Sequence, residues 1–484
     1  MGRIGDLSRR DMLKLFGVSV AGSLAGVTYP TKLRAQSSRV TPLGTARNCI
    51  VIQNNGAPSP PEFLDFKETK YTAGDLDPQV VAGNSDFILS KTLLPRMDVW
   101  APHAAVVRGM QGVALVHFPA QYHVQAGRAF NPALVREIPA LGSVIAKDLE
   151  PQRRESDTFP SYISFDLDIA RCPPLGTGML PPKYAGLDLT TGTILETFGG
   201  GGEDTSKSEV LSQRYETLGR MLEVSSMGND ALGSKAGEYG ASYDSAIQLL
   251  MDPRFQQVLD VTDEEKQRYG VDANRARANF GLGMLLARNV LKADAGSRFL
   301  WVCNSTNGGN GQFDNHDVLY DREASLTGGR VSVYQSLPRF DMALASLVED
   351  LIAMPGHEAG KTAFDETLIA VVTEFGRTPD MNPHGGRDHY IQAYPMMLMG
   401  GGIKGGRVMG KTDETGGKVI DTGWNFREQT MMDHMASTIH SALGTDYSSV
   451  IEDTPSGRAY EYQQTAPLGG PGFIPLSGFE DLFI

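Results

Sequence analysis

Cysteine is scarce in this chain, with three residues in 484: Cys49, Cys172 and Cys303. An odd number without a C-x-x-C pair excludes a disulfide scaffold and a thiolate zinc site. Cys49 and Cys303 lie in or beside apolar runs. We therefore expect both to be inert core side chains.

Positive charge is also in deficit. The chain has 44 Lys and Arg against 57 Asp and Glu, a formal net charge of −13. This balance argues against non-specific binding to DNA or to anionic membranes, and it predicts no nucleic-acid partner. It leaves room for a local basic pocket. The apolar and charged fractions, 41% and 21%, are ordinary for a globular protein.

No apolar run is long enough to span a membrane, and the run at 15–26 is interrupted by Gly and Ser. It follows Arg9 and Arg10, so residues 1–35 are typical of a twin-arginine export signal. We expect an exported protein of the periplasm or cell envelope, with the twin-arginine translocase as its partner during export. The alternatives are a retained anchor and a cytosolic amphipathic helix.

Apolar runs without polar alternation predict strands that are buried on both faces. They are separated by segments with helical spacing, such as 208–224 and 333–354. This order is typical of an α/β fold with a mostly parallel central sheet flanked by helices. We expect a single domain over 36–484, with an irregular C-terminal tail. The predicted strands are 48–53, 104–110, 162–165, 298–303, 367–373 and 394–399.

Polar side chains follow three of these strands. In an open α/β sheet, ligands bind outside the carboxyl ends of the strands. Carboxylates and imidazoles from several such loops are suitable ligands for one or two divalent cations. Arg377 or Arg387 could clamp a planar anion. The residues are Ser59 and Glu62 after the first strand, Asp314 and His316 after 298–303, and Glu374, Arg377, Asp388 and His389 after 367–373.

Each of these residues also has a purely structural interpretation. Glu374 and Arg377 could form an ion pair beneath a loop. Ser59 could be an ordinary turn residue between two prolines. The Asp388-His389 and Asp314-Asn315-His316 pairs could be turn hydrogen bonds. His117 and His123 are interpreted as loop or core histidines rather than ligands.

Several motifs, taken together and in order, resemble a family of exported bacterial proteins. The family is sulfatase-like, is catalogued as domain of unknown function 1501, and is distantly related to the alkaline phosphatase superfamily. The resemblance extends from Asn48 to Gly444. The motifs are Gly56-Ala57-Pro58-Ser59, His117-Phe118-Pro119-Ala120, Asp314-Asn315-His316, Glu374-Phe375-Gly376-Arg377-Thr378-Pro379 and Gly386-Arg387-Asp388-His389.

The resemblance implies an alkaline-phosphatase-like α/β fold and a metal-dependent hydrolase of phosphate or sulfate esters. It makes Ser59 the nucleophile-side serine. Arg377 would stabilise transition-state charge. The ion would be zinc, calcium, magnesium or manganese. The predicted metal ligands are Glu62, Asp314, His316, Glu374, Asp388 and His389.

The chain departs from the family and superfamily patterns in three places. The family's Trp-Asp-Thr-His is here Phe313-Asp314-Asn315-His316. Phe375 stands where phosphatases and sulfatases have an imidazole after the late strand. Pro60 and Pro61 stand before Glu62 in the first loop. The Cys-x-Pro-x-Arg signature is absent, which argues against a formylglycine-type sulfatase.

Three functions stay open. The first is hydrolysis of an anionic small-molecule or glycan ester, using Ser59 or water as the nucleophile. The second is a non-catalytic envelope protein that keeps the fold and binds an anionic glycan or a protein partner. The third is a cofactorless esterase that pairs Ser59 with a histidine base, although the chain has no G-x-S-x-G elbow.

Overall fold

The computed structural model describes residues 40–198, 247–271, 279–305, 312–324, 332–423, 429–464 and 477–483. The chain divides into two compact units, Met1–Ser38 and Arg39–Ile484, and the described residues belong to the second. The predicted signal at 1–35 and the predicted helix at 208–224 lie outside the described residues. Among the described helices, none combines the length and the apolar character needed to cross a membrane.

The apolar runs form an eight-stranded sheet in the order β12-β4-β11-β8-β1-β7-β5-β6. All neighbouring pairs are parallel except the two that involve β11, which runs antiparallel to both β4 and β8. The predicted mostly parallel α/β sheet is thus confirmed. The strands are β1 (Asn48–Asn54), β4 (Ala104–Met110), β5 (Tyr162–Phe165), β6 (Leu187–Leu189), β7 (Phe299–Asn304), β8 (Thr367–Val372), β11 (Tyr394–Met399) and β12 (Arg407–Met409).

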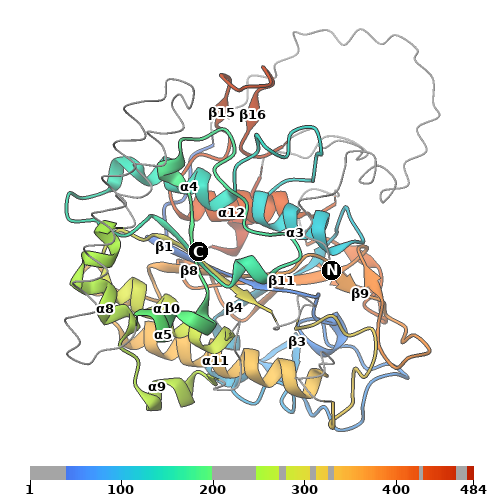
Figure 1. Cartoon of the computed structure of the whole chain (residues 1–484). Helices are drawn as coiled ribbons and strands as arrows, with labels where there is room; N and C mark the ends of the chain where they lie inside the picture. Colours follow the sequence, from blue (N-terminus) through green and yellow to red (C-terminus); the bar gives the residue numbers. More distant parts are fainter. Residues whose placement is uncertain are drawn as a thin grey trace, which may run out of the picture. The chain divides into compact units, whose positions relative to one another are not determined.

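Helices cover both faces of the sheet (Figure 1). Along β1, Ile50 and Ile52 face a core built with α10 and α11, whereas Cys49 and Val51 face a second core built with α4 and α12. Burying each such aliphatic side chain contributes about 1.5–3 kcal/mol. The helices are α2 (Met97–Trp100), α3 (His117–Ala126), α4 (Leu141–Leu149), α5 (Thr191–Phe198), α8 (Pro253–Leu259), α9 (Asp263–Arg268), α10 (Phe280–Ala293), α11 (Val333–Ala353) and α12 (Met432–Ala442).

Four two-stranded sheets lie outside the main sheet. In one of them, β9 and β10, the antiparallel register sets His389 opposite Arg377. The strands are β2 (Pro78–Val81), β3 (Asn84–Ser90), β9 (Gly376–Arg377), β10 (His389–Tyr390), β13 (Lys411–Thr412), β14 (Val419–Asp421), β15 (Val450–Ile451) and β16 (Tyr460–Glu461). All three cysteines are buried and free, so the predicted inert core positions of Cys49 and Cys303 are confirmed.

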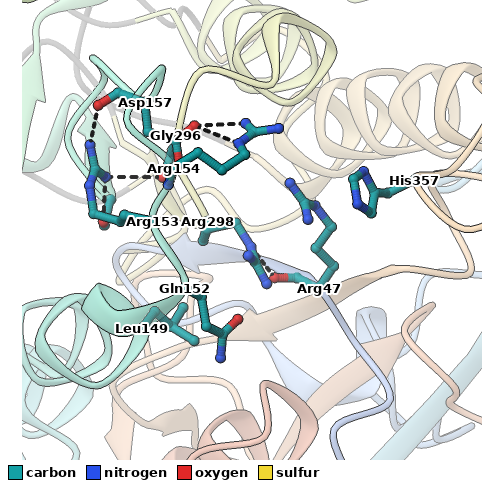
Figure 2. A pocket seen from close by; sticks show the side chains of 10 residues that line it. Arg47, Leu149, Gln152, Arg153, Arg154, Asp157, Gly296, Arg298 and His357 are labelled. Atoms are coloured by element: carbon teal, nitrogen blue, oxygen red, sulfur yellow. Dashed lines mark hydrogen bonds and ion pairs between the residues drawn. The ribbon is translucent and has the colours of Figure 1, made fainter.

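The shared strand direction gives the main sheet two chemically distinct edges. Strands β1, β4, β7 and β8 run the same way, so the loops that follow them meet at one edge. At the opposite edge, Arg47 directly precedes β1 and Arg298 directly precedes β7. These two arginines line a pocket there (Figure 2).

His440 on α12 provides a test of how this core responds to acid. It is 2% exposed, and burial lowers its pKa from the ordinary 6.5 to about 4. Between these pH values the unfolded chain binds a proton that the folded chain does not, so the free energy of unfolding falls as the pH falls. Between pH 7 and pH 4, His440 should lower the free energy of unfolding by ~3 kcal/mol. His440→Gln should abolish this part of the decrease. Urea unfolding of both proteins at both pH values measures this difference. Equal pH dependence in the two proteins would contradict it.

Candidate metal centre

Four loops at the carboxyl edge of the sheet bring histidines and carboxylates together. His117 begins α3, which follows β4, and Glu374 follows β8. Asp314 and His316 lie in the chain after β7. His389 begins β10, opposite Arg377 of β9. The parallel strand direction therefore collects side chains that are up to 272 positions apart in the sequence.

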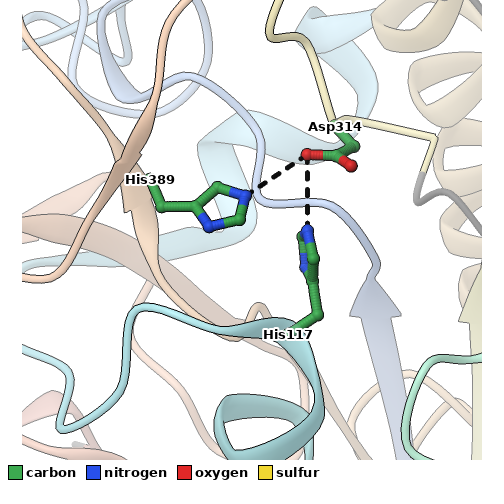
Figure 3. Close-up of side chains that lie close together, drawn as sticks. All are labelled: His117, Asp314 and His389. Carbon is green, nitrogen blue, oxygen red and sulfur yellow. Dashed lines mark hydrogen bonds and ion pairs between the residues drawn. The ribbon is translucent and has the colours of Figure 1, made fainter. Parts of the chain in front are cut away.

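Three imidazoles converge on one carboxylate oxygen, Oδ1 of Asp314. The Nε2 atoms of His117, His316 and His389 lie 3.4, 3.2 and 3.5 Å from it. The Nε2 atoms of His316 and His389 are 3.0 Å apart. His117, Asp314 and His389 are the group whose ligand atoms all lie within 4.8 Å of one another (Figure 3).

The other ring nitrogen of each histidine faces an acceptor. His389 Nδ1 donates to the Leu115 carbonyl at 2.7 Å. His117 Nδ1 lies 3.0 Å from Glu374 Oε1, and His316 Nδ1 lies 2.9 Å from Asp388 Oδ1. In a neutral ring, an acceptor at Nδ1 fixes the proton there and leaves the Nε2 lone pair available. Metal-binding histidines are held in this way in proteins generally.

The carboxylates of the cluster are ionised. Burial alone would raise the pKa of Asp314, but its hydrogen bonds with His117 and His389 and the charge of Arg377 hold that pKa far below its usual range. Burial likewise acts against ionisation of Glu374, and the hydrogen bond and charge of His117 reverse the effect. Burial lowers the pKa of His117, but hydrogen bonds with Asp314 and Glu374 outweigh burial and raise it to about 9.

Arg377, predicted to stabilise transition-state charge, lies beneath the cluster and binds Asp314. Its side chain is fully buried, and Nη2 is 2.6 Å from Asp314 Oδ1. The guanidinium also donates to three backbone carbonyls, at Ala57 (3.1 Å), Arg387 (3.0 Å) and Gly56. These bonds use most of its donors. Arg377 therefore holds Asp314 in place instead of clamping an anion from solvent.

Glu62 and Glu374, both predicted as ligands, have other partners. The Glu62 carboxylate is buried and accepts from Arg387, at 2.9 Å, and from the Tyr320 hydroxyl, so it is not among the groups that converge on Asp314. This pair also occupies Arg387, the other predicted anion clamp. Glu374 Oε1 accepts from the Gly56 N–H (2.8 Å) and from Gln121 (3.1 Å) as well as facing His117. Glu374 thus lies behind His117 and orients the imidazole.

Ser59, the predicted nucleophile, is 3% exposed. It precedes a short 3₁₀ helix at Pro60–Glu62, and among the described residues its hydroxyl has no hydrogen-bond partner. The turn before it has positive φ angles, 92° at Gly56 and 65° at Ala57. A non-glycine residue in this conformation costs about 1–2 kcal/mol. Because the guanidinium of Arg377 binds both carbonyls of this turn, it offsets that strain.

His117 is the site residue that sequence reasoning missed, since it was interpreted as a loop or core histidine. The signal that could have found it is its place just beyond β4, at the same sheet edge as the other loops. In this chain Phe375 replaces the imidazole of the superfamily pattern. His117 supplies an imidazole near this position, because its ring lies 5.2 Å from the Phe375 ring. His123 is a core residue as predicted, buried and 2.7 Å from Asp433.

The donor set suits a transition metal better than a hard cation. Three imidazole nitrogens and one carboxylate oxygen are ligands typical of zinc, whereas calcium and magnesium prefer all-oxygen sites. The number of nitrogen atoms around Asp314 Oδ1 also indicates a cation site. Four nitrogen atoms lie within 3.5 Å of this oxygen, more than its lone pairs can satisfy as hydrogen-bond acceptors. The residues present therefore fit a bound cation.

The role of Arg377 is tested by its removal. Arg377→Met would leave the Asp314 carboxylate, which is 15% exposed, and three backbone carbonyls without this donor, so we expect a loss of ~3–5 kcal/mol in unfolding free energy. Arg322→Met is the matched control, because that side chain is 58% exposed in its ion pair and its loss should cost far less. Denaturant unfolding measures both. Equal costs would contradict a holding role for Arg377.

Solved structures similar to this chain include members of the alkaline phosphatase and sulfatase group. Lipoteichoic acid synthase LtaP from Listeria monocytogenes is 8% identical, with a TM-score of 0.36 over 84% of this chain and 76% of that one. An alkaline phosphatase superfamily protein from Vibrio parahaemolyticus is 10% identical, with a TM-score of 0.33 over 84% and 70%. The sulfatase PsFucS1 from Pseudoalteromonas sp. is 13% identical, with a TM-score of 0.34 over 84% and 75%. At such identities nothing of their chemistry is carried over to this chain.

No curated protein matches the chain. A family model described as "Protein of unknown function (DUF1501)" matches residues 46–466. This span covers most of the 484 residues and includes every loop of the candidate metal centre. The chain belongs to this family, as its motifs indicate.

Proposed function

We propose that this chain is a metal-dependent hydrolase of phosphate or sulfate esters, with zinc held by His117, His389 and Asp314 and with the His316 imidazole beside this group. One observation carries the proposal. Three Nε2 atoms converge within 3.5 Å of one carboxylate oxygen, while each Nδ1 is held by an acceptor.

A hydrogen-bond network without metal explains this arrangement less well. In such a network, Asp314 Oδ1 would receive three imidazoles in addition to Arg377. The Nε2 atoms of His316 and His389 would also face each other at 3.0 Å. If both rings are neutral and carry their proton on Nδ1, where each faces an acceptor, two lone pairs meet at this contact. A cation between the rings satisfies both lone pairs and the carboxylate.

When bound, such an ion polarises ester oxygens and lowers the pKa of a coordinated water. The chain itself supplies orientation and charge. Glu374 and Asp388 hold two imidazoles, and the Leu115 carbonyl holds the third. Arg377 keeps Asp314 ionised and in place. These groups are fixed before substrate arrives, so little reorganisation accompanies the reaction.

We infer that water, and not Ser59, is the nucleophile. The Ser59 hydroxyl is buried and the residue is 3% exposed, so an ester has no direct approach to it. In the step we propose, the water oxygen bonds to phosphorus or sulfur and the bond to the ester oxygen breaks. The alcohol leaves with one proton, and the second proton stays with the inorganic acid or passes to solvent.

The substrate class is an anionic small-molecule or glycan ester, met outside the cytoplasm after twin-arginine export. Residues 1–35 support export by their paired arginines and short apolar run. The competing function is a non-catalytic envelope protein that binds an anionic glycan or a protein partner through the same edge of the sheet. The two functions differ in whether a metal-loaded protein turns over an ester.

The first test measures metal and turnover together. The purified chain should contain about one zinc ion and should hydrolyse p-nitrophenyl phosphate or sulfate, and a chelator should abolish the hydrolysis. His117→Ala and His389→Ala should lose both metal and turnover. His384→Ala is the matched control, because this exposed histidine lies in the same loop and should leave both unchanged. A zinc-loaded protein that hydrolyses neither ester would favour the non-catalytic function, and a protein that binds no metal would end the proposal.

The second test concerns the nucleophile. Ser59→Ala should keep kcat within about threefold of the parent chain, whereas loss of a true nucleophile costs several orders of magnitude. Turnover in ¹⁸O-labelled water, read by mass spectrometry of the released anion, gives an independent result. Loss of all turnover in Ser59→Ala with the zinc content unchanged would assign the attack to Ser59 instead.

A further inference from the structure

A polar cavity lies at the amino edge of the sheet, opposite the candidate metal centre. Its volume is about 200 Å³, and four arginines line it: Arg47, Arg153, Arg154 and Arg298. Arg47 and Arg298 directly precede the neighbouring parallel strands β1 and β7. Their side chains and that of His357 extend toward the same space (Figure 2). On a chain with a net charge of −13, this concentration of positive charge is unusual.

The acidic residues nearby do not balance this charge. Arg154 takes both of them: Nη2 is 2.7 Å from Asp157 Oδ1, and Nη1 is 2.8 Å from Asp294 Oδ2. Arg47 shares Asp294 through Nη2, also at 2.8 Å. Four guanidiniums thus face two carboxylates, an excess of two positive charges around the cavity.

Arg153 has a structural role in the wall of the cavity. Its guanidinium donates to the carbonyls of Asp157 (2.7 Å), Phe159 (2.9 Å) and Gly296 (3.3 Å) and to the Ser161 hydroxyl (2.7 Å). These bonds tie the chain before β5 to the turn before β7. The arrangement is rigid, and it leaves Arg153 few donors for a ligand.

Arg298 is the arginine whose charge is left without a counter-ion. Its Nε donates to the Arg47 carbonyl at 2.6 Å. Its two terminal nitrogens have no hydrogen-bond partner within the described parts of the chain. Burial, reinforced by the charge of Arg47, lowers the pKa of Arg298 to about 10. A half-buried cation beside a second cation is costly unless an anion joins them.

We propose that this cavity binds a tetrahedral oxyanion, a phosphate or sulfate group, between the terminal nitrogens of Arg298 and the free donors of Arg47. The planar fork of a guanidinium matches two oxygens of such a group. The group belongs either to a free inorganic ion or to a small monoester. The proposal is independent of the proposed hydrolase function, because it concerns the other edge of the sheet and needs no metal.

The test is calorimetric titration of the chelator-treated full chain with inorganic phosphate, inorganic sulfate and glucose 6-phosphate, at constant ionic strength in chloride. We expect one ion per chain. Arg298→Gln should weaken binding at least tenfold, and Arg298→Lys, which keeps the charge without the fork, should weaken it less. Arg322→Gln, at an exposed ion pair elsewhere, should bind as the parent chain does. His389→Ala should also bind normally, which separates this cavity from the metal centre.

Each outcome has a defined meaning. Tighter binding of glucose 6-phosphate than of phosphate assigns the cavity to a monoester, and the reverse assigns it to a free ion. If Arg298→Gln does not fold, Arg47→Gln replaces it, because the Arg47 carbonyl that holds Arg298 is kept; it should weaken binding severalfold. The proposal is overturned if no anion binds, if Arg298→Gln binds as the parent chain does, or if His389→Ala abolishes binding.

Discussion

The candidate metal centre depends on one ion pair, that of the buried Arg377 with Asp314. A guanidinium removed from water needs acceptors for its donors, and this one uses four hydrogen bonds to join three loops: the turn after β1, the chain after β7 and the approach to β10. Asp314 Oδ1, the atom to which it is bound, is also the point on which the three imidazoles converge. Arg377 therefore fixes the carboxylate oxygen around which the three histidines lie. Breaking such a pair is costly because the remaining charge stays buried.

Strand direction separates two kinds of chemistry in this fold. The ends of parallel strands align, so the carboxyl edge collects Asp314, Glu374 and the histidines, and the amino edge collects Arg47 and Arg298. β1 has seven residues, and a strand of that length spans roughly 23 Å. Opposite charges are thereby kept well beyond the Debye length of about 8 Å at physiological salt. An anion at the arginine cavity and a cation at the histidines would be largely screened from each other.

The sequence predicts which edge of the sheet carries the candidate site better than it predicts where each side chain points. Apolar runs without alternation predict β1, β7 and β8, and the polar residues that follow them predict where Asp314, His316 and His389 gather. The burial of Arg377 could not be predicted, because its acceptors are carbonyls turned inward by the positive φ angles of Gly56 and Ala57. His117 was missed for a similar reason. Its partner Glu374 is 257 positions away, and only the strand order β4-β11-β8 brings the two together.

The three imidazoles differ in exposure, and this difference defines how the site opens. The side chains of His117 and His389 are 15% and 21% exposed, and that of His316 is 43% exposed. The carboxylates behind His117 and His316 differ in exposure in the same order. Glu374, behind His117, is fully buried and fixed by three donors, whereas Asp388, behind His316, is 56% exposed. An ion at this centre would thus have a rigid wall on the His117 side and a solvent-facing wall on the His316 side. If the proposed function holds, water and ester approach on the side of His316, the most exposed of the three imidazoles.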